Sequence, residues 1–308
     1  LYPHGRVSEV QRRQMTSVDA PNVHALAIEG TFDDCQAIVK ALFQHPRFAE
    51  DVRLSGVNSI NWARVAAQVV YYFTSAVALG APHRPVSFSV PTGNFGDILA
   101  GWVAKRMGLP VGRLMIGTNA NDILARTLES GTYELRGVQP TTSPSMDIQI
   151  SSNFERLLFE AMDRDSEAVV RLMSGLRQSG AFRLDPEILD RVRAEFDAAA
   201  VPEPEVVAEI RRVHETTGQV LDPHSAIGVH AARRLLAADP ATPVVALATA
   251  HAAKFPDAVE AATGLRPALP PHLADLMDRP ERVSVVANDE AAVERFIRER
   301  ARILRSAA

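Results

Sequence analysis

The sequence is poor in cysteine and in long apolar runs, and each shortage excludes a class of protein. Its 308 residues include one cysteine, Cys35, so no disulfide can form within the chain, and a reducing compartment such as the cytoplasm fits best. No apolar run reaches the roughly 20 residues that a membrane-spanning helix needs. Residues 1–6 also lack the charged-then-apolar order of a signal peptide. We therefore expect no membrane partner.

An excess of positive charge is also absent. The chain has 33 basic and 37 acidic residues, and its formal net charge is -4. Nucleic-acid backbones recruit basic surfaces, so the composition gives no support to a nucleic-acid partner. Nearly all the basic residues are arginine, so any reaction that needs a lysine amine has only three candidates in this chain: Lys40, Lys105 and Lys254.

Helical and strand patterns alternate along most of the chain. A capping box predicts a helix from Ser8 to about residue 18, and Thr31 caps a second helix that ends before Pro46. A long helix is expected over 61–79, with apolar residues on nearly every side, which indicates deep burial. Strands are expected at 1–3, 23–28, 86–90, 113–116, 243–249 and 282–287. Further helices are expected at 97–107, 122–128 and 290–304, and residues 152–240 are predicted almost wholly helical, with one helix over 186–199. This order predicts an α/β protein with an open, mostly parallel sheet flanked by helices.

Residues 91–97 (PTGNFGD) join a predicted strand to a predicted helix and form the most informative segment. A helix N-terminus presents unpaired N–H groups and partial positive charge, so it binds anions. Gly93 and Gly96 let the backbone approach a ligand closely, Asn94 can turn the chain, and Thr92 supplies a hydroxyl. The segment is neither a Walker loop nor a dinucleotide fingerprint. It predicts a phosphate site, with an ordinary strand-to-helix turn as the alternative.

A second segment, residues 248–256 (ATAHAAKFP), follows the predicted strand at 243–249. Thr249 lies at the carboxyl end of that strand, where open α/β sheets bind ligands. Taken alone, the segment also fits a polar strand terminus followed by a helix.

Residues 91–97 and 249–256 together resemble the signature segments of the threonine synthase family. Residues 1–8 (LYPHGRVS), 29–34 (EGTFDD), 58–64 (NSINWAR) and 151–156 (SSNFER) resemble that family in the same order. The resemblance covers most of the chain and is weakest beyond Gly264. It implies a fold type II (tryptophan synthase β-like) enzyme that uses pyridoxal 5'-phosphate. Such an enzyme converts O-phospho-L-homoserine and water to L-threonine and phosphate.

The resemblance also assigns the cofactor site. It implies that Thr249 hydrogen-bonds the pyridine nitrogen of the cofactor and leaves that nitrogen largely unprotonated, which suits elimination and replacement chemistry. The backbone amides that bind the cofactor phosphate would be those of Gly93, Asn94, Phe95, Gly96 and Asp97.

The substrate carries a phosphate of its own and needs a second anion site. Arginine grips phosphate with two hydrogen bonds and lysine acts as a point charge. The candidates are Ser59, Asn61, Arg64 and Lys254, each with a surface or helix-capping role as the alternative. His251 either moves protons or holds its loop by a hydrogen bond.

The sequence departs from the family in the lysine that holds the cofactor as a Schiff base. In the family, a Ser-Phe-Lys-Asp-like segment supplies it, and a Ser-Gly-Asp-Thr-Gly-like segment binds the substrate carboxylate. Both lie upstream of everything present here, so we expect the Schiff-base lysine outside this chain and no turnover by the chain alone. We expect residues 1–61 to be a remnant of a small substrate-side domain with an exposed sheet edge. Residues 62–308 would form the large cofactor domain with a helical insertion at about 152–240.

Other functions stay open at this point. Another fold type II enzyme, such as a serine/threonine dehydratase or a tryptophan synthase β-like protein, shares the phosphate loop. A non-catalytic binding protein on the same scaffold fits the missing lysine. A nucleotide-binding protein fits less well, because neither nucleotide fingerprint is present. The sequence leaves the oligomeric state open between monomer and dimer.

Overall fold

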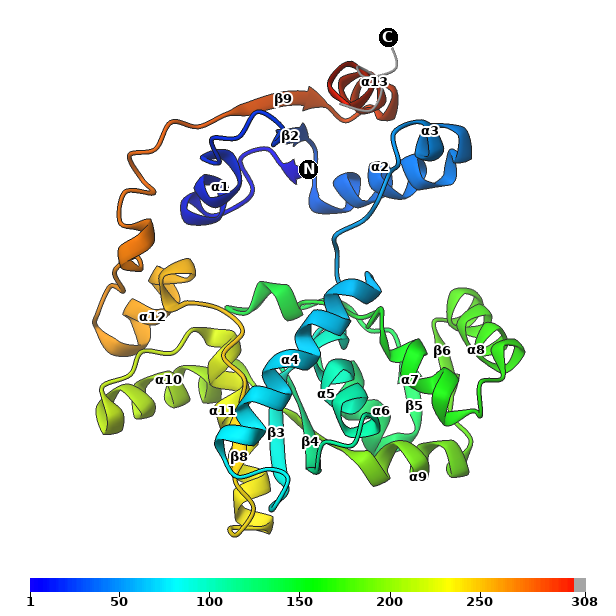
Figure 1. Ribbon diagram of the computed structural model, residues 1–308, viewed down its shortest axis with the longest axis vertical. Coiled ribbons are helices and arrows are strands. Elements are labelled where there is room, and N and C mark those ends of the chain that lie inside the picture. Colours follow the sequence, from blue (N-terminus) through cyan, green and yellow to red (C-terminus); the bar gives the residue numbers. More distant parts are fainter. Residues whose placement is uncertain (302–308) are drawn as a thin grey trace. The chain divides into compact units, whose positions relative to one another are not determined.

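The computed structural model describes residues 1–301 and divides the chain into two compact units (Figure 1). The smaller unit contains residues 1–56 and the described residues from 268 onward, and the larger unit contains residues 57–267. The expected division into 1–61 and 62–308 differs from this one at the C-terminal end. The chain returns to the small unit there, because a late strand pairs with an early one.

The small unit is built on three parallel strands in the order β1-β2-β9. These are β1 (Tyr2–Pro3), β2 (Ala25–Glu29) and β9 (Val283–Ala287). Its helices are α1 (Glu9–Thr16), α2 (Phe32–Gln44), α3 (Pro46–Asp51) and α13 (Glu290–Arg300). The predicted starts of the helices capped by Ser8 and Thr31 are confirmed. The Ser8 hydroxyl accepts a hydrogen bond from the backbone amide of Gln11, and the Thr31 hydroxyl accepts one from the backbone amide of Asp34. The last predicted helix runs to residue 304, and its end lies outside the described residues.

The large unit is built on four parallel strands in the order β7-β4-β3-β8. They are β3 (Val86–Pro91), β4 (Val111–Thr118), β7 (Phe196–Ala200) and β8 (Val244–Ala246). The larger helices are α4 (Trp62–Ala78), α5 (Gly96–Arg106), α8 (Ser166–Ser179), α9 (Pro186–Glu195), α10 (Glu203–Thr217) and α11 (Pro223–Ala238). The shorter ones are α6 (Ile123–Ser130), α7 (Phe154–Ala161) and α12 (Pro256–Thr263), and β5 (Thr132–Glu134) pairs antiparallel with β6 (Ala181–Arg183). In the part of the chain that the structure describes, no helix has the length and apolarity to cross a membrane.

Alternate residues of β4 place helices on the two faces of the large sheet. Leu114 faces α5, where it lies close to the backbone of Gly101, and Gly117 faces Ile227 of α11. Because strand side chains alternate between faces, these even and odd positions point to opposite sides. The helices α4 and α5 therefore cover one face (Figure 1), and α11 covers the other.

Two expectations about this unit are wrong. The helix expected over 186–199 ends at Glu195, and β7 begins at Phe196 because residues 196–200 pair with β4. Alanine favours helices, but pairing within a sheet overrides that weak preference. The long helix α4 is not deeply buried either, since Val70 and Val77 are 61% and 60% exposed.

The contact between α5 and the α4 side chain Tyr72 gives a stability prediction. A Cβ added at Gly101 would lie 2.5 Å from Cε1 of the fully buried Tyr72, so Gly101→Ala must displace a packed ring. We expect a loss of about 1–3 kcal/mol in the free energy of unfolding, measured by urea denaturation. Gly175→Ala in α8 is the matched control, because its Cβ meets nothing closer than 3.8 Å. The control should be unchanged or stabilised by up to about 1 kcal/mol, and equal effects of the two substitutions would contradict the packing argument.

Candidate functional site

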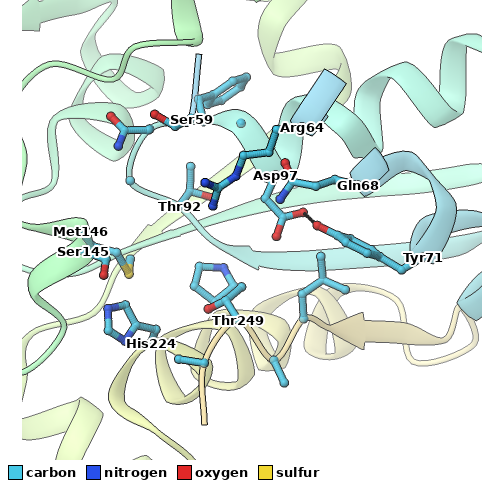
Figure 2. Close-up of a pocket in the computed structure, with 18 of the residues that line it drawn as sticks. Ser59, Arg64, Gln68, Tyr71, Thr92, Asp97, Ser145, Met146, His224 and Thr249 are labelled. Carbon is cyan, nitrogen blue, oxygen red and sulfur yellow. Dashed lines mark hydrogen bonds between the residues drawn. The ribbon is translucent and has the colours of Figure 1, made fainter. Parts of the chain in front are cut away.

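A cavity of about 880 Å³ lies in the large unit at the carboxyl ends of β3 and β8. Its walls come from residues 91–97, from α4, from Ser145 and Met146, from the start of α11, and from residues 247–250 and 254–255 (Figure 2). The volume is typical of small-molecule sites. Both segments singled out in the sequence therefore meet in one cavity, although about 150 residues separate them in the sequence.

The loop after β3 presents a row of unpaired amides to this cavity. Within residues 1–301, no acceptor is found for the backbone N–H groups of Gly93, Asn94, Phe95, Gly96 and Asp97. The last two belong to the first turn of α5, where intrahelical partners do not exist. Consecutive free amides at a helix N-terminus form an anion site.

In contrast to the free amides, two carbonyl oxygens of the same loop accept hydrogen bonds from other residues. Ser151 donates its hydroxyl to the Gly93 carbonyl at 2.7 Å, and the Asn153 side chain donates to the Asn94 carbonyl at 2.9 Å. The backbone amide of Asn153 also donates to Asn94, at 3.2 Å. We call Ser151 and Asn153 the carbonyl clamp. Because it occupies the carbonyl oxygens, the peptide planes are fixed and the amides stay free for a ligand.

Phe95 anchors the loop in a conformation that is unusual for a residue with a side chain. Its backbone is left-handed, with φ 62° and ψ 0°. Its ring is 1% exposed and packs against Phe154 and Phe196, with ring centroids 5.4 and 5.6 Å away. Buried aromatic packing thus offsets a strain of roughly 1–3 kcal/mol at this position.

The glycines on either side of Phe95 leave room for the close approach of other groups. A Cβ at Gly93 would lie 2.9 Å from the carbonyl oxygen of Ser145. A Cβ at Gly96 would enter the space between Asn153 and Ser59, 3.4 and 3.5 Å from their nearest atoms. A side chain at Gly93 would therefore have to displace the backbone at Ser145, whereas one at Gly96 would meet its neighbours at ordinary contact distance.

The side chains of Thr92 and Asp97 do not serve the anion. The Thr92 hydroxyl is buried and donates to the carbonyl of Val90 in its own strand at 2.7 Å. The Asp97 carboxylate accepts the Tyr71 hydroxyl at 2.6 Å (Figure 2). It also accepts the Tyr72 hydroxyl at 3.0 Å. Burial raises the pKa of Asp97, and those two hydrogen bonds and the charge of Arg64 only partly oppose the rise.

Thr249 and Lys254 also line the cavity. Thr249 lies three residues beyond β8 and its side chain is exposed to the cavity (Figure 2). The Lys254 ammonium lies 5.8 Å from the centroid of the Phe255 ring. His251 does not line the cavity, because its Nδ1 accepts the amide of Ala253 at 3.1 Å and so holds the loop.

Of the four candidates for a second anion site, the structure places three at the cavity and one away from it. Ser59, Arg64 and Lys254 line the cavity, and Arg64 turns its guanidinium toward it (Figure 2). Asn61 does not line it. Its side chain caps α4 by accepting the amide of Ala63 at 2.9 Å, which is the capping role held as the alternative.

The sequence analysis does not predict several of the residues that line the cavity. Ser145 and Met146 reach the cavity because a buried network around Asn119 and Asp147 holds their loop, with 2.8 Å between the amide of Asn119 and the carboxylate of Asp147. His224 enters from α11, and Gln68 and Tyr71 enter from α4. A histidine directly after the helix-start pair Asp222-Pro223 was the only sequence signal for any of these.

The three lysines occupy unlike environments. Lys40 is exposed on α2 of the small unit, and the Lys105 ammonium lies 2.5 Å from the Glu195 carboxylate. Lys254 alone among them lines the cavity.

Comparison with known proteins gives a consistent result along the chain. The family described as "Threonine synthase, C-terminal" matches residues 225–297. The threonine synthases of Pseudomonas aeruginosa and Corynebacterium glutamicum are 51% and 42% identical to this chain over 96% of it. The chain spans 63% of the length of each of these curated relatives.

Solved structures agree with these relatives. The structure of threonine synthase with bound PLP from Brucella melitensis is 60% identical, with a TM-score of 0.93 over 97% of this chain and 64% of that one. Yeast threonine synthase is 40% identical with a TM-score of 0.87. The predicted fold type II architecture, with parallel sheets flanked by helices, is confirmed.

The raised pKa of Asp97 predicts a pH dependence of stability. Because the pKa of Asp97 in the folded state lies above the ordinary 3.8, protonated Asp97 contributes to the free energy of unfolding. This contribution is fully present below pH 3.8 and is lost as the pH rises through the folded pKa. Asp97→Asn removes that loss, so its free energy of unfolding should rise relative to wild type as the pH increases above 3.8. Urea denaturation at several pH values measures this. Asp190→Asn, at a carboxylate that is 77% exposed, should show a flat difference, and a flat difference for Asp97→Asn would refute the burial argument.

Proposed function

We propose that this chain, which belongs to the threonine synthase family, forms the cofactor-holding part of an enzyme that makes L-threonine and phosphate from O-phospho-L-homoserine and water. Its relatives at 40–60% identity are threonine synthases, and one of their structures has PLP bound. The observation that carries the proposal is the row of free amides at residues 93–97, in one cavity with Thr249.

The residues present fit pyridoxal 5'-phosphate. The amide row offers donors to a dianionic phosphate, and the missing side chains at Gly93 and Gly96 leave the cradle open. The Thr249 hydroxyl can donate a hydrogen bond to the ring nitrogen of the cofactor. A carboxylate at this position would stabilise the protonated form of that nitrogen, but a neutral hydroxyl does not. When bound, this cofactor supplies an electron sink for carbanions of amino acids. The chain's own residues bind it, orient it and set the protonation of its ring.

The substrate phosphate would lie against Arg64, with Ser59 and Lys254 as further donors. All three line the cavity. An arginine and a lysine together offer both geometric and electrostatic recognition of a phosphate ester. This arrangement favours a phosphorylated amino acid over serine as the substrate, and so favours threonine synthase over a dehydratase.

We infer that the lysine amine that holds the cofactor comes from a part of the enzyme outside the sequence studied. Lys40 lies in the other unit and Lys105 pairs with Glu195, which leaves Lys254. Lys254 follows the Thr249 segment, in a position that the family resemblance does not assign to the Schiff base. The relatives are also longer than this chain.

The assignment of residues 93–97 as the phosphate site predicts that a methyl group added at Gly93 weakens binding. Gly93→Ala should weaken binding of both pyridoxal 5'-phosphate and inorganic phosphate by about tenfold or more, because a Cβ 2.9 Å from the Ser145 carbonyl must shift the loop. Titration followed by absorbance for the cofactor and by calorimetry for phosphate measures both. Gly137→Ala is the matched control, since its Cβ meets nothing within 4 Å.

Two results, one from this titration and one from a separate reduction experiment, would contradict the proposals. Unchanged phosphate affinity in Gly93→Ala would remove the loop as the anion site. Borohydride reduction of the wild-type chain with bound cofactor should leave no stoichiometric adduct, and an adduct mapped to Lys254 would place the reactive amine within this chain.

A further inference from the structure

His224 is a buried histidine in the cavity with one nitrogen unaccounted for. It lies in the first turn of α11, is 4% exposed and lines the cavity on the same side as Thr249 (Figure 2). Its Nδ1 lies 3.0 Å from the carboxylate of Asp222. Its Nε2 is buried and has no hydrogen-bond partner among residues 1–301.

Asp222 fixes which nitrogen of the ring carries the proton. Its carboxylate accepts the backbone amides of His224 and Ser225 at 2.8 and 3.3 Å, and also the Ser225 hydroxyl. Burial alone would raise the pKa of Asp222, but the hydrogen bonds from His224 and Ser225 outweigh it and lower the pKa. An ionised carboxylate is only an acceptor, so Nδ1 must donate to it. When the ring is neutral, Nε2 then carries a lone pair.

The rest of the surroundings give Nε2 no other role. The ring packs on Phe255, with centroids 4.8 Å apart, and this contact holds the ring without satisfying its nitrogen. A buried acceptor with no partner is costly, and such a group in a native protein calls for an explanation such as a bound ligand, water or ion. A carboxylate that orients an imidazole from behind is the arrangement by which proteins aim a histidine at a ligand.

We propose that His224 is a further ligand-binding residue of this site, with Nε2 accepting a hydrogen bond from the ring end of a phosphorylated heteroaromatic ligand. The donor would be a ring hydroxyl or a protonated ring nitrogen, and Asp222 is the residue that positions the imidazole. This inference rests on the proposed function, because it takes pyridoxal 5'-phosphate as the ligand. It adds a third contact to the amide row and Thr249.

Binding by the whole chain with two probes tests the assignment. His224→Phe keeps a ring against Phe255 but removes the nitrogen. It should weaken pyridoxal 5'-phosphate binding about tenfold and leave inorganic phosphate affinity within about twofold, because neither of the two proposed phosphate sites includes His224. His224→Gln, whose amide can reach a similar position, should recover most of the loss. Thermal unfolding of both variants in the absence of ligand checks that the fold is kept.

A measurement on the wild-type chain needs no variant. Nitrogen-15 NMR of the histidine rings should show His224 protonated at Nδ1 and bare at Nε2, and pyridoxal 5'-phosphate should shift Nε2 while leaving Nδ1 protonated. Asp222→Asn, which keeps a helix-capping side chain, should disturb this tautomer.

The outcomes separate the two proposals. Equal cofactor affinity in wild type and His224→Phe, or an Nε2 resonance that the cofactor leaves unmoved, would overturn the role of His224 while the proposed function stands. A wild-type chain that binds inorganic phosphate but not pyridoxal 5'-phosphate would overturn the proposed function, and this inference with it.

Discussion

The carbonyl clamp is the constraint on which the site depends. A loop of successive peptides can turn either its N–H groups or its carbonyls toward a cavity, and only the first choice binds an anion. Ser151 and Asn153 take the carbonyls of Gly93 and Asn94, and the buried ring of Phe95 holds the left-handed residue between the glycines. The amides are therefore oriented toward the cavity in advance, so anion binding there would cost little reorganisation.

The electrostatics of the loop agree with this geometry. Asp97 lies in the first turn of α5, where a carboxylate would compete with a bound phosphate for the same positive end of the helix. Burial beside Tyr71 and Tyr72 raises its pKa, which disfavours the charged form next to the anion site. Arg64 adds a positive charge at the same cavity. An anion in this cavity would therefore meet free backbone donors and the positive charge of Arg64 together.

Much of this site could be predicted from the sequence, because its two main segments are local. The strand–loop–helix pattern around Gly93 and the position of Thr249 after a strand each follow from neighbouring residues. The remaining features depend on contacts between distant residues. The pairing of β9 with β2, the strand at Phe196 and the arrival of Ser145 in the cavity come from tertiary packing that no local pattern encodes. The free Nε2 of His224 is visible only once its surroundings are known.

The most direct test of the account follows the backbone amides themselves. Amide proton and nitrogen shifts of the isotope-labelled chain should be recorded while inorganic phosphate, and then pyridoxal 5'-phosphate, is added. The account predicts that both ligands move the resonances of residues 93–97 downfield together, since both place phosphate oxygens on the same N–H groups. If both ligands bind but those five amides stay unshifted while only side-chain signals such as Arg64 respond, the amide row is not the phosphate site and the account is wrong.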